Sequence, residues 1–600
     1  MGFLDWLDDR TGVRSLLRSA LYEHIPGGAR WRYIWGSTLT FAIFVQFVTG
    51  IVLWAAYSPN ALGAWESVYY IQNVMAGGWL LRGVHHFMAQ AMIVLLVLHL
   101  MQILIDRAYK APREVNFWFG LGLLFIVLGL SLTGYLLPWD QKGYWATKVA
   151  TSIASITPVI GPQLQQVLVG GADYGHLTLT RFFALHAGVL PAALVLLVVG
   201  HVYLFRRHGV TPPKSADTSE NGNVWPDQVL KDGVASLVVL LVVLLLVLWD
   251  GGAPLGAPAD PVEPYAAARP EWYFMFLFQW LKYFPAGWEV VGAHVFPGLV
   301  VGVIAVMPII GRWQLGHRVN VGVTGALRVA LGLLTWRGDC SDAADPAVQA
   351  AQEEAETAAE RVTVLAGAGI PIGGGIELVR SDPYLQGPPL FAQNCASCHT
   401  FDGHDGTGGP VEEVEAADLA GDGTRAWLEG LIDPDRIGTP EYFGATAHRR
   451  GAMWRFVTRR LRTYDDEQLE KVDKVLDAVA AEANPDATHS PAAAARIAEG
   501  RELFGDPDVG CAECHTFGTF TAESDGPVLD GWGSRAWILG MIHDPTQERF
   551  YGDDNDRMPS FGVDESLTER EMGLVTDWLR GDWYEPEDEG ASSEGGGPEG

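Results

Sequence analysis

The chain has 600 residues, 48% of them hydrophobic, and a formal net charge of −30. Residues 1–338 contain 22 Lys and Arg against 18 Asp and Glu, whereas residues 339–600 contain 19 against 53. A near-neutral apolar part followed by an acidic part excludes a single compact soluble domain. The acidic charge argues against nucleic-acid binding and suits a solvated surface or a basic protein partner.

The first thirty-two residues, which include Trp6, Leu17 and several Arg, predict a surface helix rather than a cleavable signal peptide. After them come a four-helix part, 33–210, and a three-helix part, 225–337. The apolar runs predict seven spans near the roughly 20 residues that a bilayer requires: 33–56, 79–105, 116–137, 181–205, 233–250, 290–310 and 319–336.

Positive residues assign the orientation of these spans. They cluster before the first span and after the second, fourth and sixth, for example at Arg32, Arg113, Arg206 and Arg312. These loops are therefore expected on the cytoplasmic side, and seven spans then carry the chain outside before residue 338. The seventh segment contains Arg328, which must snorkel or pair.

Four histidines occur at matched positions in two of the spans. His85 and His99 lie in the second, and His186 and His201 in the fourth. A separation of 14 or 15 residues is about four helical turns, so both histidines of a helix face one side, about 21 Å apart along its axis. Any one could merely pack or hydrogen-bond, but four at this spacing predict two bis-histidine haem sites. Because both helices run inward, His85 pairs with His186 near the outer surface, and His99 with His201 near the inner one.

Glycines repeat with the same period in the first and third spans. Gly36 and Gly50, and Gly120 and Gly134, are each 14 residues apart. A helix without a Cβ at these points lets a flat macrocycle approach its backbone. Glycine is also common in membrane helices for packing reasons, so this pattern counts only together with the histidines.

Several stretches match a known family. GWLLRGVHHFMAQAMIVLLVLHL, TGYLLPWDQKGYWA, LTRFFALHAGVLPAALVLLVVGH and RPEWYFMF closely resemble cytochrome b of the quinol-oxidising bc complexes, over roughly residues 20–336. The histidine spacing and PWDQKGYWA are more similar to the chloroplast and cyanobacterial branch. That branch anchors an extra haem on a cysteine near the first span, and WRYIWGS supplies none, so the resemblance does not extend to that haem.

The resemblance assigns the PEWY motif, which is Pro270, Glu271, Trp272 and Tyr273, to an outer quinol-oxidation site. The predicted topology independently puts this loop, after the fifth span, on the outer face. Oxidising a quinol releases protons, and Glu271 is a suitable acceptor. A Glu at a loop surface beside an interfacial aromatic belt is the alternative.

The resemblance also implies roles for residues around this site. Arg82, three residues before His85, is similar to the family's haem-propionate partner. A cation at the membrane edge costs little free energy, because its charged group stays in contact with water. Lys142, Tyr144 and Trp145 follow PWD in an outer loop and are expected to line the quinol pocket.

The mechanism that the resemblance implies divides the two electrons of the quinol. One goes to an iron–sulfur protein and on to a c-type haem, and the other crosses the membrane through two b haems to quinone at the inner face. The chain has no cysteine–histidine pair for a Rieske cluster, so that protein is expected as a separate partner.

The acidic part follows a linker, 338–385, and contains two similar segments. The first has CASCH, GTRAWLEGLIDP and GAM, and the second has CAECH, GSRAWILGMIHDP and RMPSF. This repetition predicts two cytochrome c domains, 386–484 and 490–583, before a disordered acidic tail, 584–600. C-x-x-C-H is the signature of covalent haem attachment, although a single copy could also be a redox dithiol or a zinc fragment. The predicted thioether and histidine ligands are Cys395, Cys398, His399, Cys511, Cys514 and His515.

A downstream methionine is expected as the second axial ligand of each c-type haem, which gives a relatively high potential. Met558 in RMPSF is one candidate, and Met453 in GAMWRF is at the matching position of the first repeat. Because no proline follows Met453, His448 and His404 remain alternatives there.

The sequence therefore predicts a mostly α protein, a seven-span bundle followed by two small all-α cytochrome c domains. The expected function is that of a cytochrome b and dihaem cytochrome c fusion subunit of a proton-translocating quinol:cytochrome c oxidoreductase. Its expected cofactors and substrates are two b-type haems, two c-type haems, and quinol and quinone. The expected partners are a Rieske protein, membrane lipid, a soluble or oxidase-bound electron acceptor and a second copy of the chain.

The expected location is a bacterial-type cytoplasmic membrane, with the c-type haems on its outer, periplasmic side. One alternative is a b-haem membrane anchor that conducts electrons from a dehydrogenase or hydrogenase to quinone. A nitric-oxide or oxygen reductase subunit would need further clustered histidines in the spans.

Overall fold

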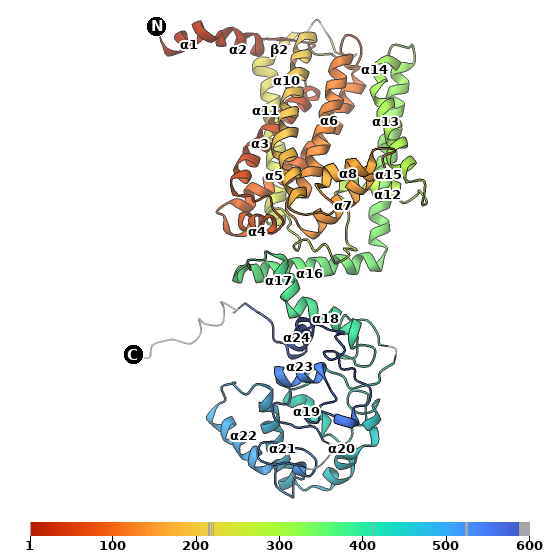
Figure 1. Cartoon of the computed structure of the whole chain (residues 1–600). Helices are drawn as coiled ribbons and strands as arrows, with labels where there is room; N and C mark the ends of the chain where they lie inside the picture. The colour runs from red at the N-terminus through yellow and green to blue at the C-terminus, as the bar shows by residue number, and fades with distance from the viewer. Residues whose placement is uncertain are drawn as a thin grey trace. The chain divides into compact units, whose positions relative to one another are not determined.

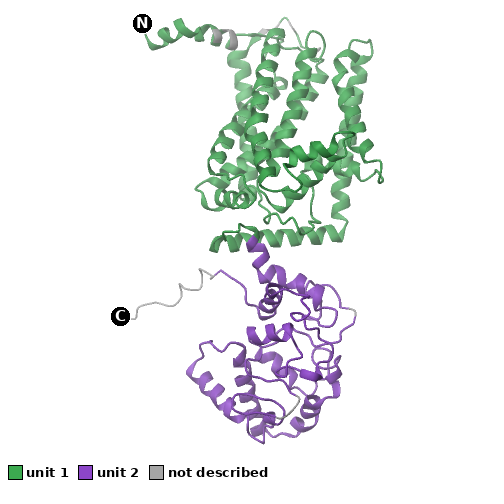
Figure 2. Cartoon of the chain, viewed as in Figure 1, with its two compact units in different colours: residues 1–376 green, residues 377–600 purple. Residues whose placement is uncertain are grey.

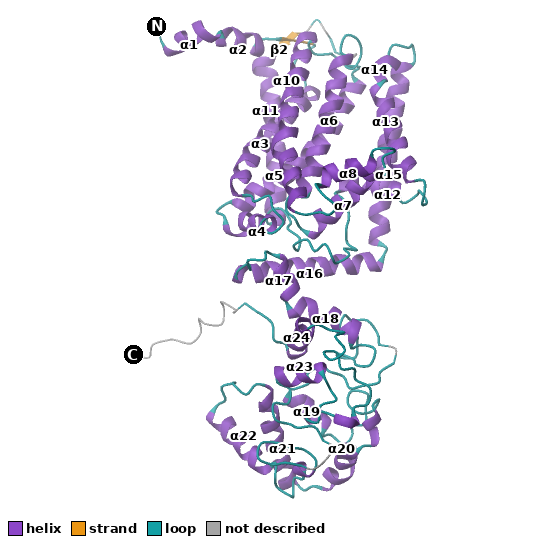
Figure 3. Ribbon diagram, viewed as in Figure 1, coloured by secondary structure: helices purple, strands orange, loops and turns teal. Residues whose placement is uncertain are grey.

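The computed structural model describes residues 2–213, 216, 217, 219, 221–411, 413–522 and 526–586. Most of them are helical (Figure 3). The chain divides into two compact units, residues 1–376 and 377–600 (Figure 2). The predicted acidic tail lies almost entirely outside the described residues.

Six helical segments of the first unit are long and apolar enough to cross a membrane (Figure 1). Helices form here because an apolar segment in lipid must satisfy every backbone group internally. Their apolar side chains also face outward; Leu237, Leu241 and Leu248, for example, are exposed. In chain order the segments are η1 and α3 (Trp31–Tyr33, Ile34–Ala56), α5 (Gly78–Ile105), α6 (Glu114–Tyr135), α9, η3 and α10 (His176–Ala184, Leu185–Val189, Leu190–His208), η4 and α11 (Val224–Gln228, Val229–Asp250), and α15 (Gly316–Ala343).

The structure differs from the prediction at the sixth expected span, 290–310. This segment is divided into η5 (Val291–Val295), α13 (Phe296–Ala305) and α14 (Met307–Ile310), and the apolar helix Val291–Ala305 is shorter than the other six. Pro308 accounts for the break at Val306, because it donates no backbone hydrogen bond and its ring crowds the preceding turn.

The helix pairs of the bundle follow the pattern of glycine and histidine. α3 packs against α5, α6 packs against α10, and α11 packs against both α3 and α5. The buried side chains between them include Met88, Met92, Val127 and Val243. Each helix with the repeated glycines therefore lies beside a helix with the repeated histidines.

One end of the bundle, here called the PEWY end, contains Pro270–Tyr273. Its other elements are α4 (Ala64–Tyr69), η2 (Tyr70–Val74), α7 (Gln141–Ser155), α8 (Gly161–Val169) and α12 (Trp272–Leu281). The indole of Trp65 ties α4 to the loop before α12 by donating to the Gly256 carbonyl at 2.8 Å.

α15 brings the chain back to the PEWY end. It is followed by α16 (Pro346–Ala368), and the Tyr69 hydroxyl donates to the Thr363 carbonyl of that helix at 3.5 Å. Beyond α16, Gly375 lies against the Trp65 ring. α17 (Ile376–Ser381) begins at the boundary between the units, so the predicted linker 338–385 is largely helical.

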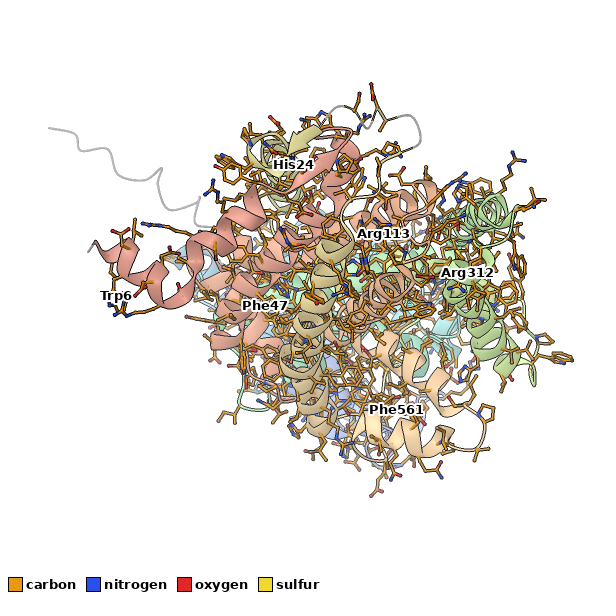
Figure 4. The ribbon with its side chains drawn as sticks, turned by 90° about the horizontal axis from the view of Figure 1, so that it is seen from above. Trp6, His24, Phe47, Arg113, Arg312 and Phe561 are labelled. Atoms are coloured by element: carbon orange, nitrogen blue, oxygen red, sulfur yellow. The ribbon has the colours of Figure 1, made fainter. Side chains whose placement is uncertain are left out.

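The opposite end of the bundle carries α1 (Phe3–Thr11), α2 (Val13–Leu21) and a two-stranded antiparallel ribbon of β1 (His24–Pro26) and β2 (Asn221–Asn223). The predicted N-terminal surface helix is thus two short helices, because Gly12 between them adopts a left-handed φ of 64°. Figure 4 looks down on this end and labels Arg113 and Arg312 there. Arg312 pairs with Glu114 at 2.8 Å.

The second unit has one hydrophobic core that draws on both sequence repeats, and the expected boundary near residues 484–490 does not divide it into two compact units. Its helices are α18 (Pro383–Asn394), α19 (Arg425–Leu431), η6 (Ala447–Arg450), α20 (Ala452–Arg455), η7 (Phe456–Arg460), η8 (Leu461–Thr463), α21 (Asp466–Ala480), η9 (Ala481–Ala483), α22 (Pro491–Leu503), η10 (Cys511–Glu513), α23 (Arg535–His543), η11 (Gly552–Asp554) and α24 (Glu569–Arg580).

Candidate functional site

The four bundle histidines meet in the two predicted pairs. The ring centres of His85 and His186 are 6.3 Å apart, and those of His99 and His201 are 6.4 Å apart. Two metal–nitrogen bonds of about 2 Å, plus about 1.1 Å from each nitrogen to its ring centre, require roughly 6.2 Å. Each pair therefore leaves room for one iron atom between two imidazoles.

The second ring nitrogens fix the orientation of the imidazoles. Nδ1 of His85 lies 2.8 Å from Thr49 Oγ1, and Nδ1 of His186 lies 3.1 Å from the Leu130 carbonyl and 3.3 Å from Thr133 Oγ1. An imidazole whose Nδ1–H is held in this way presents Nε2 to a metal.

The His99–His201 pair is held differently. Nδ1 of His201 lies 3.1 Å from the Asn116 carbonyl. Nδ1 of His99 is buried and has no hydrogen-bond partner among the described residues.

A π-helical turn explains why the histidines of the fourth span are 15 residues apart rather than 14. His186 lies in η3, a π-helix between α9 and α10. A π-turn accommodates one extra residue within an α-helix. His201 is thereby returned to the face of α10 that lies opposite His99.

Each repeated glycine lies against one of the four imidazoles. A Cβ at Gly134 would meet Cε1 of His186 at 2.6 Å, and one at Gly50 or Gly120 would meet its histidine at 3.3 Å. At Gly36 the corresponding distance to His99 is 3.6 Å, an ordinary contact. The sequence predicted room for a macrocycle, and the structure adds that these glycines make room for the histidine rings.

At the PEWY end, Glu271 is the residue before α12. Its carboxylate lies 3.4 Å from Lys142 Nζ, and the Glu271 side chain is only 13% exposed, against 44% for Lys142. The structure therefore brings together an acidic and a basic group from segments 129 residues apart. A mostly buried carboxylate next to a cation at a bundle end is able to accept a proton and pass it outward.

The aromatic residues of the motif connect this site to the helix of His85. The Trp272 indole donates to Gln90 Oε1 on α5 at 3.3 Å, and its ring lies edge-on to Tyr273 at 5.4 Å. Burial raises the pKa of Tyr273 to about 12. Its phenol therefore stays protonated at neutral pH.

Asp140 positions the segment that contains Lys142. Its carboxylate caps α7 by accepting from the Gly143 amide at 2.8 Å, and it also accepts from the Gly256 amide at 3.1 Å. α7 and the loop before α12 are thereby joined next to Glu271.

Tyr144 and Trp145 follow Lys142 in the first turns of α7 and belong to an aromatic cluster. Tyr144 is buried, and its ring contacts Trp139, Trp145 and Tyr174 at 5.3–5.7 Å. Burial raises the pKa of Tyr144. The cluster supports the segment around Lys142, and no hydrogen bond joins Tyr144 to Glu271 among the described residues.

The Arg82 guanidinium holds a loop. It donates to the carbonyls of Ala253 and Pro254, both at 2.7 Å, and to Gln72 Oε1 at 3.0 Å. The predicted propionate partner is thus bound to backbone carbonyls at the PEWY end, close to the helix turn that contains His85.

In the second unit, the histidine of each C-x-x-C-H motif is half-buried. Nδ1 of His399 lies 2.8 Å from the Ala417 carbonyl, and Nδ1 of His515 lies 2.9 Å from the Pro527 carbonyl. Burial lowers the pKa of both imidazoles, so they are neutral at pH 7 with Nε2 available to a metal.

The cysteines of the motifs are unlike a redox dithiol. Burial raises the pKa of the Cys395 and Cys511 thiols to about 12. Reactive dithiols have lowered thiol pKa values. No disulfide joins the cysteines among the described residues, and both motifs fit covalent attachment of a group more closely than thiol exchange.

The alternative ligands of the first motif are engaged elsewhere. His404 Nδ1 accepts from the Gly406 amide at 3.0 Å, and the His448 ring stacks on Tyr551 at 5.7 Å. Met453 and Met558 are both partly buried against the core of the unit.

Sequence reasoning missed Thr49, Thr133 and Gln90. A signal for the threonines exists, because each directly precedes a repeated glycine, in VTG and in LTG. Gln90 has no comparable signal, since its contact with Trp272 depends on the packing of α12.

Known proteins are similar to the first unit. Residues 90–267 match the family described as cytochrome b(N-terminal)/b6/petB. Over 217 residues the chain is 41% identical to the menaquinol:cytochrome c reductase cytochrome b subunit of Bacillus subtilis, covering 35% of this chain and 97% of that protein. It is 34% identical over 209 residues to cytochrome b6 of Synechococcus elongatus, covering 35% and 97%. It is 32% identical over 318 residues to cytochrome b of Rhodobacter capsulatus, covering 50% and 72%.

Replacing Gly134 by Ala is expected to remove most of the haem held by His85 and His186. The added methyl group would lie 2.6 Å from the His186 ring, and overpacking of this kind costs about 1–3 kcal/mol. The b-type haem content per chain, from reduced-minus-oxidised absorption of the purified protein, measures the loss.

Gly36→Ala is the matched control, because its Cβ would meet His99 at an ordinary 3.6 Å. Both changes raise helix propensity equally, so only the steric term differs. A full haem content in the Gly134→Ala variant, or an equal loss in both variants, would contradict this account of the glycines.

Proposed function

The chain belongs to the cytochrome b/b6 family, and on that premise we propose that it is a fused cytochrome b and dihaem cytochrome c subunit of a quinol:cytochrome c oxidoreductase. The observation that carries the proposal is the spacing of the two imidazole pairs, 6.3 and 6.4 Å between ring centres, at two levels of one bundle. When bound, b-type haems at these levels supply one-electron carriers across the membrane.

The PEWY end supplies the acid–base chemistry that quinol oxidation requires. A quinol hydroxyl must lose its proton as the ring is oxidised, and Glu271 is the carboxylate in position to take it. The Glu271 carboxylate pairs with Lys142 Nζ at 3.4 Å. Trp272, bonded to Gln90 on the helix of His85, fixes the start of α12 and so the position of Glu271.

Electron transfer from this site needs a short path to the nearer imidazole pair. Arg82 binds the loop at Ala253 and Pro254 to α5, three residues before His85. We assign it the role of keeping the quinol loop at a fixed distance from the His85–His186 pair. The His99–His201 pair, near the opposite end, would pass electrons to quinone there.

The two C-x-x-C-H motifs would receive the other electron through a Rieske protein. Four of the five cysteines belong to these motifs, and Cys340 alone cannot hold an iron–sulfur cluster. The neutral, half-buried imidazoles of His399 and His515 suit axial ligation of covalently attached haems. Such haems would pass electrons to an outer, soluble or oxidase-bound acceptor.

Membrane topology supports an exported second unit. α15 ends at the PEWY end, where α16 contacts Tyr69, and the quinol-oxidising end is the outer one under this proposal. The positive residues at the opposite end, among them Arg113 and Arg312, are those expected on the cytoplasmic side (Figure 4). We infer that residues after 376 lie outside a bacterial-type cytoplasmic membrane, and that the complex is a dimer that translocates protons.

Replacing Glu271 by Gln tests the proposed function. Gln keeps the size of the side chain but accepts no proton, and loss of a positioned acid–base group lowers turnover by about 100-fold or more. The measurement is the rate of quinol-dependent cytochrome c reduction by the purified complex, with and without inhibitors of outer quinol sites.

Glu289→Gln is the control, since Glu289 is an exposed carboxylate that accepts from the nearby backbone, including the Gly287 amide at 2.9 Å. Its turnover is expected to stay at the wild-type level. Unchanged turnover in the Glu271→Gln variant would remove Glu271 from the mechanism, and a wild-type complex that oxidises no quinol would refute the function.

A reporter fused after residue 600 tests the orientation. Alkaline phosphatase, which is active only outside the cytoplasm, is expected to be active there, whereas a fusion truncated after His208 is expected to be inactive. Cytoplasmic fluorescence of a green fluorescent protein fused at the C-terminus would refute the proposed export of the second unit.

A further inference from the structure

The helices that precede the two C-x-x-C-H motifs share a pattern that fits close helix packing. α18 contains Gly387 and Phe391, whereas α22 contains Gly500 and is capped at its C-terminus by Phe504; each pair is four residues apart and lies shortly before its motif. A glycine at such a point lets another helix approach the backbone. The helix that approaches each glycine therefore identifies the partner of its motif.

The partner of α18 comes from the other end of the unit. α18 packs against α24, and a Cβ at Gly387 would overlap the Trp578 ring. The ring centre of Trp578 also lies 5.4 Å from that of Phe391 and 4.3 Å from that of Phe401. Phe401 follows His399 by two residues. The last helix of the second repeat, α24, thus packs beside the motif of the first repeat.

The partner of α22 comes from the first repeat. α22 packs against α21, and a Cβ at Gly500 would overlap the Lys474 carbonyl. Lys471 of α21 pairs with Asp506 at 3.0 Å, shortly before Cys511. The helix near the end of the first repeat, α21, thus packs beside the segment that leads into the motif of the second repeat.

The segments next to the two methionines cross over in the same way. Arg557, adjacent to Met558, pairs with Glu415 at 2.7 Å, and the Glu415 amide donates to the Cys398 carbonyl at 3.0 Å. The loop of Met558 therefore lies against the first motif.

Met453 lies against the second motif by a corresponding route. It belongs to α20, which continues directly into η7. Arg460, at the end of η7, bonds both carboxylate oxygens of Glu513, within the second motif, at 2.8 Å. The Tyr464 hydroxyl, four residues on, donates to the Val509 carbonyl at 3.0 Å.

We propose that each c-type haem site is assembled from both repeats, with Met558 as the axial ligand opposite His399 and Met453 as the ligand opposite His515. The assignment rests on the proposed covalent haems. It also explains why residues 377–600 form one compact unit with one core, because neither repeat contains a complete site.

Single-haem backgrounds of the full-length protein test the pairing. With Cys511 and Cys514 replaced by Ala, the haem at His399 is the one c-type haem that remains, and Met558→Ala is expected to abolish the near-infrared absorption band of methionine-ligated ferric haem. Met453→Ala in the same background is the matched control and is expected to keep the band.

The reciprocal background reverses the expectation. With Cys395 and Cys398 replaced by Ala, Met453→Ala is expected to abolish the band and Met558→Ala to keep it. The opposite pattern in either background would overturn the crossed pairing and leave the proposed function intact. Absence of covalent haem from the wild-type chain would overturn both together.

Cross-linking of the unmodified chain tests the helix exchange without relying on variants. A zero-length carbodiimide reagent joins lysines to carboxylates in contact. Peptides that link Lys471 to Asp506 and Lys474 to Glu499, which pair at 3.0 and 2.9 Å, are expected by mass spectrometry. Their absence from the folded protein, while other Lys–carboxylate links form, would overturn the composite sites even if the variants failed to mature.

Discussion

The separation of two pairs of imidazole rings is the constraint on which the rest of the bundle depends. Ring centres 6.3 and 6.4 Å apart accommodate one metal atom and little else. Holding this spacing at two levels requires helices that approach closely, which is why α3 and α6 carry glycine opposite each histidine. It also requires the extra residue of the π-turn at His186, without which His201 would face away from His99.

The PEWY end couples this electronic path to protons. Glu271 and Lys142 come together because Asp140 joins α7 to the loop before α12, and Trp272 bonds the helix of His85 through Gln90. Arg82 binds the same loop from one turn away. The proposed proton acceptor, Glu271, and the His85–His186 pair are thus connected through a few hydrogen-bonded residues. A displacement of the loop before α12 would therefore disturb both.

Sequence reasoning located the features that depend on local spacing. The span positions other than 290–310, the histidine pairs and their glycine partners follow from the sequence pattern, and the structure brings the histidines and glycines together as expected. Sequence reasoning could not locate the features that depend on which distant segments of the chain pack together. The shortened helix before Pro308, the engagement of Arg82 with backbone carbonyls and the contact of Gln90 with Trp272 are of this kind. The two c-type repeats are the clearest case, because similarity defines what each segment forms but not which copy it packs against.

The most direct test of the central claim is a pyridine haemochrome assay of the purified full-length chain, combined with a redox titration. Two b-type and two c-type haems per chain are predicted, with the b-type haems titrating as two separate components that vanish in the His85→Ala and His99→Ala variants respectively. Fewer than two b-type haems per wild-type chain, or full b-type haem content in both variants, would contradict the assignment of the four bundle histidines.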